Sequence, residues 1–73
     1  MLKTKDRGAP LTLDIHGAFV RRTDLSGASL RGANMTDADA TNAIFRNVDF
    51  EGAILLRTVL RGADLTGARN LTV

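Results

Sequence analysis

The sequence contains no cysteine, tryptophan or tyrosine, and it has one histidine and one proline. Without cysteine the chain has no thiol nucleophile, no disulfide and no cysteine-based metal site. No run of apolar residues approaches the length of a membrane-spanning helix. The segment that begins with Met1 to Lys3 is too polar and too short for a signal peptide. We therefore expect a cytoplasmic protein that does not insert into a membrane.

The polar residues do not form a recognisable catalytic or metal-binding motif. His16 has Asp14 two residues away, but no serine or second metal ligand stands at a spacing that would fix it nearby. Six of the seven glycines are separated by multiples of five residues, which is not the spacing of a phosphate-binding loop. We predict a protein without catalytic residues, cofactor or metal.

What the sequence does contain is a period of five. Every fifth residue is apolar, through eleven successive positions: Ile15, Val20, Leu25, Leu30, Met35, Ala40, Phe45, Phe50, Leu55, Leu60 and Leu65. This period fits neither a helix nor a flat strand, so the chain has to turn a corner every five residues.

Three other positions of the repeat are also patterned. From residue 18 to residue 68, the position two before each central one is alanine eight times, with three larger exceptions at Thr23, Val48 and Thr58. One residue before it, an acid or amide recurs at Asp14, Asp24, Asn34, Asp39, Asp49 and Asp64. Two residues after it stand Gly17, Gly27, Gly32, Gly52, Gly62 and Gly67. Glycine there permits the backbone angles of a tight turn.

These residues resemble the pentapeptide-repeat family, whose pattern is A-[D/N]-L-x-x. The match is close at 63–65 (Ala-Asp-Leu) and at 33–35 (Ala-Asn-Met), and the register covers roughly residues 13–72. The resemblance implies an all-β fold, a right-handed quadrilateral parallel β-helix with four pentapeptides per coil and about three coils. Central and small residues would point inward, and the other three positions would face water.

Some residues do not fit the pattern of the repeat. The acid or amide position is apolar at Phe19, Ile44, Ile54 and Val59. The central position is polar at Asn70, which we expect to end the regular array.

Charges give an independent test of a coil of twenty residues. Residues that far apart should stack on neighbouring coils, roughly 4.8 Å apart. Three charged pairs have this separation, and all are opposite in sign: Arg31 with Glu51, Asp37 with Arg57, and Asp49 with Arg69.

Both ends of such a stack need a cover. We assign residues 1–12, which lack the repeat, as an N-terminal capping segment, and residues 13–73 as the repeat domain. At the other end an uncovered hydrogen-bonding edge favours pairing with another chain. We therefore expect a protein partner or a homodimer through the C-terminal coil.

The net charge of the repeat argues against one activity that the resemblance suggests. The best-known activity in that family is the inhibition of DNA gyrase by long, acidic, DNA-shaped dimers. Residues 13–73 contain seven arginines and seven acids and are neutral, so mimicry of DNA is not expected. Arg21, Arg22 and Arg61 give one weakly basic surface, but acids dilute it, and we expect no nucleic-acid partner.

These observations argue against an enzyme and a nucleic-acid-binding protein, so we expect the protein to bind another protein through its surface. Apolar side chains that should face water are typical of an interface, and the candidates are Phe19, Ile54, Leu56, Val59, Leu71 and Val73. A shift of register, with Leu56 instead of Leu55 pointing inward, is the other explanation for part of this set. We predict a non-catalytic protein-interaction module of bacterial origin. The alternative is a regulator of a DNA-handling enzyme such as a topoisomerase.

Overall fold

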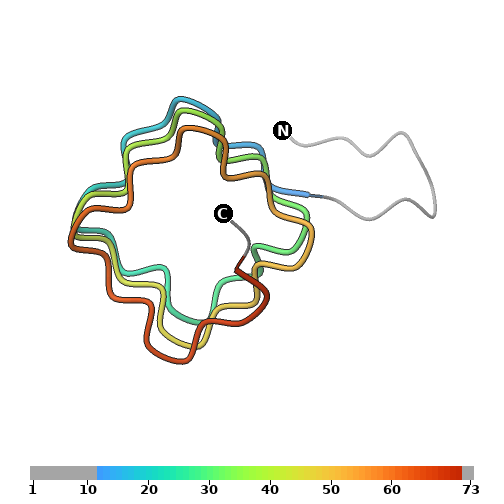
Figure 1. The fold of residues 1–73 in the computed structure, drawn as a ribbon, viewed down its shortest axis with the longest axis vertical. Helices are drawn as coiled ribbons and strands as arrows, with labels where there is room; N and C mark the ends of the chain where they lie inside the picture. The colour runs from blue at the N-terminus through green and yellow to red at the C-terminus, as the bar shows by residue number, and fades with distance from the viewer. Residues whose placement is uncertain (1–11, 72–73) are drawn as a thin grey trace, which may run out of the picture.

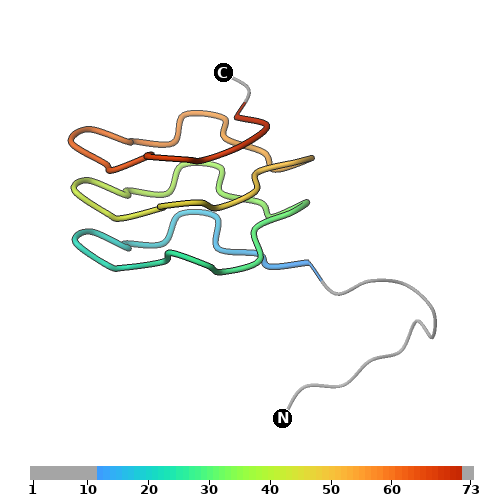
Figure 2. The ribbon, with the colours of Figure 1, turned by 90° about the horizontal axis from the view of Figure 1, so that it is seen from below.

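The computed structural model describes residues 12–71. The predicted N-terminal cap, apart from Thr12, and Val73 lie outside this range. The described chain winds around one axis with a four-sided outline (Figure 1), and seen from the side its coils lie one above another (Figure 2). Eight parallel bridges each join a residue to the residue twenty positions later. The twenty-residue coil expected from the charge pairs is therefore confirmed.

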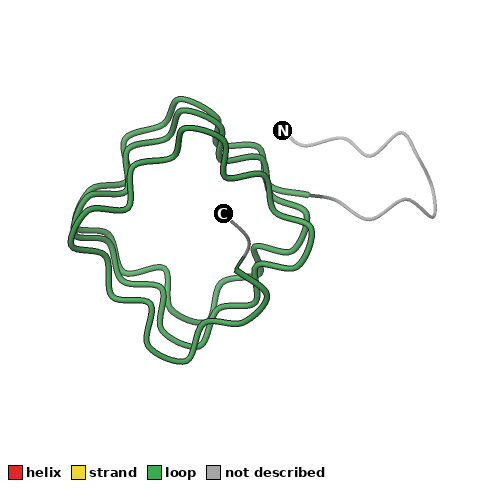
Figure 3. Ribbon diagram, viewed as in Figure 1, coloured by secondary structure: helices red, strands yellow, loops and turns green. Residues whose placement is uncertain are grey.

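Within residues 12–71 there is neither a helix nor a continuous strand, and the backbone pairs through isolated bridges (Figure 3). Each side of a coil is too short for a strand, because a turn interrupts it every five residues. The parallel pairing expected for an all-β chain is present, whereas extended strands do not form.

The stack has four sides, each built from one pentapeptide of every coil. Residues 13–17, 33–37 and 53–57 form the first side, and 18–22, 38–42 and 58–62 the second. Residues 23–27, 43–47 and 63–67 form the third side, and 28–32, 48–52 and 68–71 the fourth.

A hydrogen-bonded turn lies at every corner. The N–H two residues before each central position donates to the carbonyl of the preceding central residue, as Ala18 does to Ile15 at 3.1 Å. The third residue of each turn has positive φ, and the second does not, which is the type II geometry. This bond is longest, 3.3 Å, at the β-branched residues Thr23, Val48 and Thr58, which replace the usual alanine.

Glycine fills six of these positive-φ positions, which confirms its predicted role. Arg22, Asp37, Asn42, Asn47 and Arg57 fill the other five. Aspartate and asparagine tolerate this conformation, whereas for a residue such as arginine it costs roughly 1–2 kcal/mol.

The core lies inside the coils, as predicted. Nine consecutive central and small positions are buried, one at the end of the first coil and eight in the middle coil: Leu30, then Ala33, Met35, Ala38, Ala40, Ala43, Phe45, Val48 and Phe50. The rings of Phe45 and Phe50 pack edge to face, with centroids 5.4 Å apart. The other apolar central residues of the outer coils, such as Ile15 and Leu60, are only partly buried, because within the described chain one coil covers them instead of two.

The regular array ends at Asn70, as expected. This residue is exposed and has φ of 57°, although its position in the repeat is an inward one. Its amide nitrogen donates to Oδ1 of Asp49 at 2.7 Å. An amide in the core would lack such a partner, so the chain bends outward here.

Candidate interaction surface

The acid or amide of the repeat has a defined backbone role. In all six cases its Oδ1 accepts the N–H two residues later, at 2.9–3.2 Å. That N–H forms no bond to another backbone group within residues 12–71. The aspartates therefore recur because each supplies an acceptor at a corner, as the sequence suggested.

A threonine two residues later strengthens this motif. The hydroxyl groups of Thr36, Thr41 and Thr66 donate to the same oxygen, at 2.5–2.7 Å. These bonds are the main reason why the pKa values of Asp39 and Asp64 lie below the ordinary value. The prediction that this position faces water is only partly right, since the side chain of Asp49 is 18% exposed.

The four apolar residues at this position cannot make the bond. Ile44 is partly buried, and the N–H of Arg46 instead finds Oγ of Ser26, at 3.2 Å. Phe19, Ile54 and Val59 are 82%, 48% and 44% exposed. No acceptor within residues 12–71 replaces the missing carboxylate for the N–H groups of Arg21, Leu56 and Arg61.

The register of the third coil excludes a shift at residues 54–56. Leu55 packs against the core, whereas Leu56 is 56% exposed. Ile54 and Leu56 therefore lie on the outside of the first side, and Val59 follows on the second side beyond the corner. We call these three residues the apolar corner.

The other predicted interface residues do not all join this corner. Phe19 and Val59 belong to one column of the second side, with Asp39 between them, as their bridges show. Leu71 is 37% exposed but follows the bend at Asn70 on the fourth side. Sequence reasoning missed Leu13, which is 43% exposed, because its position in the repeat is an inward one.

The three predicted charge pairs are all present. Arg57 forms a two-pronged contact with Asp37, at 2.6 and 3.1 Å, and Arg31 lies 2.7 Å from Glu51. Arg69 lies 3.9 Å from Asp49. Apart from Asp49 their side chains are largely exposed, so these pairs add little to the free energy of unfolding and chiefly align the coils.

Two further ion pairs run diagonally between coils. Arg21 lies 3.8 Å from Asp39, and Arg46 lies 3.9 Å from Asp64. The two residues of each pair are 18 positions apart, so looking for charges twenty positions apart in the sequence does not find these pairs.

The predicted basic residues all lie on the second side. Arg21, Arg22 and Arg61 stand there against the single acid Asp39, which gives this side a net charge of +2. The first and third sides each have net charge −1 with His16 neutral, and the fourth side is neutral. Arg22 and Arg61 form no ion pair with any other residue of 12–71.

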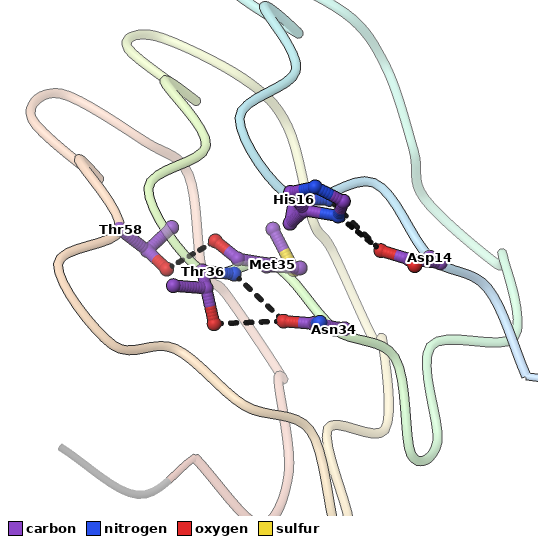
Figure 4. A network of polar contacts seen from close by, with 6 residues as sticks. All are labelled: Asp14, His16, Asn34, Met35, Thr36 and Thr58. Carbon is purple, nitrogen blue, oxygen red and sulfur yellow. Dashed lines mark hydrogen bonds and ion pairs between the residues drawn. The ribbon is translucent and has the colours of Figure 1, made fainter.

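His16 lies on the first coil, with its Nδ1 2.8 Å from Oδ1 of Asp14 (Figure 4). On the neighbouring coil Asn34 and Thr36 form the same motif without an ionisable group. The bond to Asp14 raises the pKa of His16, and the bond to His16 lowers the pKa of Asp14. Residues 12–71 contain no cluster of three or more His, Cys, Asp or Glu side chains that suits a metal.

We expect Asp14→Asn to lower the pKa of His16 toward its ordinary value, measured by NMR titration of the imidazole. A raised pKa means that protonated His16 stabilises the fold below the ordinary pKa and loses this effect as pH rises through the raised value. The melting temperatures of the two proteins should therefore differ more at about pH 5 than at about pH 8. An unchanged His16 pKa in the variant would contradict the assigned hydrogen bond.

No helix within the described residues is long and apolar enough to cross a membrane. A search of curated proteins finds no match to the chain. The family model for pentapeptide repeats matches residues 14–47 and 43–72, with eight copies of the repeat. Up to residue 71, the matched residues are those that form the bridged coils and their corners, and the match spans most of the chain. The chain therefore belongs to the pentapeptide-repeat family.

Proposed function

We propose that this protein is a non-catalytic interaction module, a right-handed quadrilateral β-helix that binds another protein or a second copy of itself. The observation that supports the proposal is the exposure of Phe19, Ile54 and Val59 at positions where aspartate or asparagine would bond the backbone. Selection for stability alone favours the polar residue there. Residues that break a local rule without a compensating contact are typical of functional sites.

The apolar corner is the first region that we assign to this function. Ile54, Leu56 and Val59 place three exposed apolar side chains around one corner of the third coil. A single exposed apolar residue is ordinary, but a cluster is typical of a protein interface. The corner is part of the regular array, so its position does not depend on the residues beyond Asn70.

The test compares the wild-type protein with the double variant Ile54→Asn, Leu56→Glu. Light scattering after size-exclusion chromatography, and affinity purification from the native host, should show a dimer or a stoichiometric complex for the wild type. The variant should keep its melting temperature and lose the complex, because both changes lie on the surface. A wild type that stays monomeric at high micromolar concentration and recovers no partner would refute the proposal.

We expect no inhibition of DNA gyrase by mimicry of DNA. Such mimicry needs a continuous negative field, but no side of the stack has a net charge below −1, and the second side is positive. Supercoiling assays with the purified protein should show full gyrase activity at micromolar concentrations. Strong inhibition that added DNA relieves would contradict this charge argument.

A further inference from the structure

Three of the residues by which the second side departs from the repeat have no compensating contact within residues 12–71. Phe19 and Val59 leave the N–H groups of Arg21 and Arg61 without the usual side-chain acceptor. Arg22 has φ of 58° at a position that glycine usually fills, and it forms no ion pair.

Elsewhere in the stack, the same kinds of departure from the repeat either have a compensating contact or lie on a side next to the second side. Arg57, the other arginine with positive φ, is held by Asp37 at 2.6 Å. Ile44, on the third side, is partly buried, and Ser26 bonds the N–H that follows it. Ile54 has no such compensation; it lies on the first side, which is joined to the second side by the turn at residues 56–57.

The second side thus combines exposed apolar groups with positive charge. Phe19 is the most exposed large apolar residue of the described chain, at 82%, and it shares a column with Val59. Arg21 and Arg61 share the neighbouring column, and Arg22 stands at the corner. Only this side of the stack has a net positive charge, +2.

We propose that the second side binds an acidic segment of a partner protein, with an apolar side chain of that segment packed against Phe19 and Val59. Arg22 and Arg61 attract its carboxylates. This inference rests on the proposed interaction function and names the chemistry of the partner. In such an interface the apolar contact contributes affinity, and the complementary charges fix the orientation of the bound segment.

Two features of the surface favour a protein segment over single-stranded nucleic acid. Nucleic-acid grooves stack successive bases on several aromatic side chains, whereas this side carries only Phe19. A phosphate chain that follows the Phe19–Val59 column meets the carboxylate of Asp39 between them. A peptide can place an apolar or hydrogen-bonding residue at that point and its acids beside the arginines.

The test selects ligands from a random peptide library of about twelve residues, displayed on phage, with the full-length protein as bait. A parallel selection uses the variant Arg22→Gln, Arg61→Gln. The wild type should enrich peptides with several acids around an apolar residue, and the variant should not. Binding of the synthesised peptides should weaken about tenfold in the variant, and also between about 50 and 500 mM salt.

A second pair of variants separates binding from folding. Phe19→Asn and Val59→Asn each restore the acceptor that the repeat normally has, so the melting temperature should stay equal to or above that of the wild type. Both should nevertheless weaken binding of the selected peptides about tenfold or more. Arg31→Gln, on the opposite side of the stack, is the matched charge control and should leave binding unchanged.

Several outcomes would overturn the inference: no enriched peptide, enrichment without acids, binding that survives these substitutions, or preferential binding of oligothymidine. The proposed interaction function has a separate test. If the complex from the native host is lost with Ile54→Asn, Leu56→Glu but kept with Arg22→Gln, Arg61→Gln, that function stands and the assignment of the acidic partner segment fails.

Discussion

Phe50→Asp is expected to unfold the protein. Phe50 is 1% exposed and packs edge to face on Phe45. The buried carboxylate would have no polar partner, which costs several kcal/mol, and the lost ring adds about 3–5 kcal/mol. A domain of this length has a total stability of only about 5–10 kcal/mol. Far-UV circular dichroism should show a helix-free folded spectrum for the wild type and an unfolded one for the variant.

Phe19→Asp is the control for this experiment, because it makes the same chemical change at a residue that is 82% exposed. The new carboxylate can accept the N–H of Arg21, although it faces Asp39 on the next coil. Repulsion between like charges at such a position costs about 1 kcal/mol at most, so the variant should stay folded. A soluble, folded Phe50→Asp protein would contradict the assigned core.

Gly62→Ala should lower stability more than Gly17→Ala, although both glycines have φ of about 70°. A Cβ on Gly17 meets no atom within 4 Å, whereas on Gly62 it would meet Oδ1 of Asn42 on the coil below. The backbone conformation should cost each variant roughly 1–2 kcal/mol. Displacement of the Asn42 side chain adds to this in Gly62→Ala alone. Denaturant unfolding measures the difference.

Asn42→Gly should restore the extra stability that Gly62→Ala loses through its contact with Asn42. It removes the side chain that covers Gly62 and keeps a residue that tolerates positive φ. The further loss of stability in Gly62→Ala should disappear when both changes are combined, and Gly17→Ala should show no such coupling. Equal losses in the two single variants would show that the backbone angle, and not the contact, decides the cost.

Much of the fold follows from the repeat. The five-residue period gave the corners and the inward positions, and the residues twenty apart gave the register that the bridges confirm. Both follow from spacing along the chain, because a turn every fifth residue fixes which two of the five positions point inward, and four such turns close one coil. The exposed residues Phe19, Leu56 and Val59 were found in the same way, as exceptions to a regular pattern.

Other features depend on which atoms meet between coils. The diagonal pairs of Arg21 with Asp39 and of Arg46 with Asp64 do not follow the coil period, since long side chains reach past the residue directly above or below. Asn42 and Gly62 do follow the coil period, but only the structure shows that Oδ1 of Asn42 occupies the space a Cβ on Gly62 would need. Leu13 was missed because its inward position in the repeat gives no warning of exposure in an outer coil.

The sequence by itself determined the family, the period and the side of the stack on which each residue lies, because these depend on spacing along the chain. Only the tertiary structure decided which departures from the repeat are compensated. The N–H of Arg46, which follows Ile44, donates to Ser26 on a neighbouring coil, and Arg57 pairs with Asp37. No such contact within residues 12–71 compensates for Phe19, Arg22 or Val59. Three of these uncompensated departures lie on the second side, and Ile54 lies on the adjoining first side. This grouping could not be read from the repeat, because compensation depends on contacts between residues about twenty positions apart.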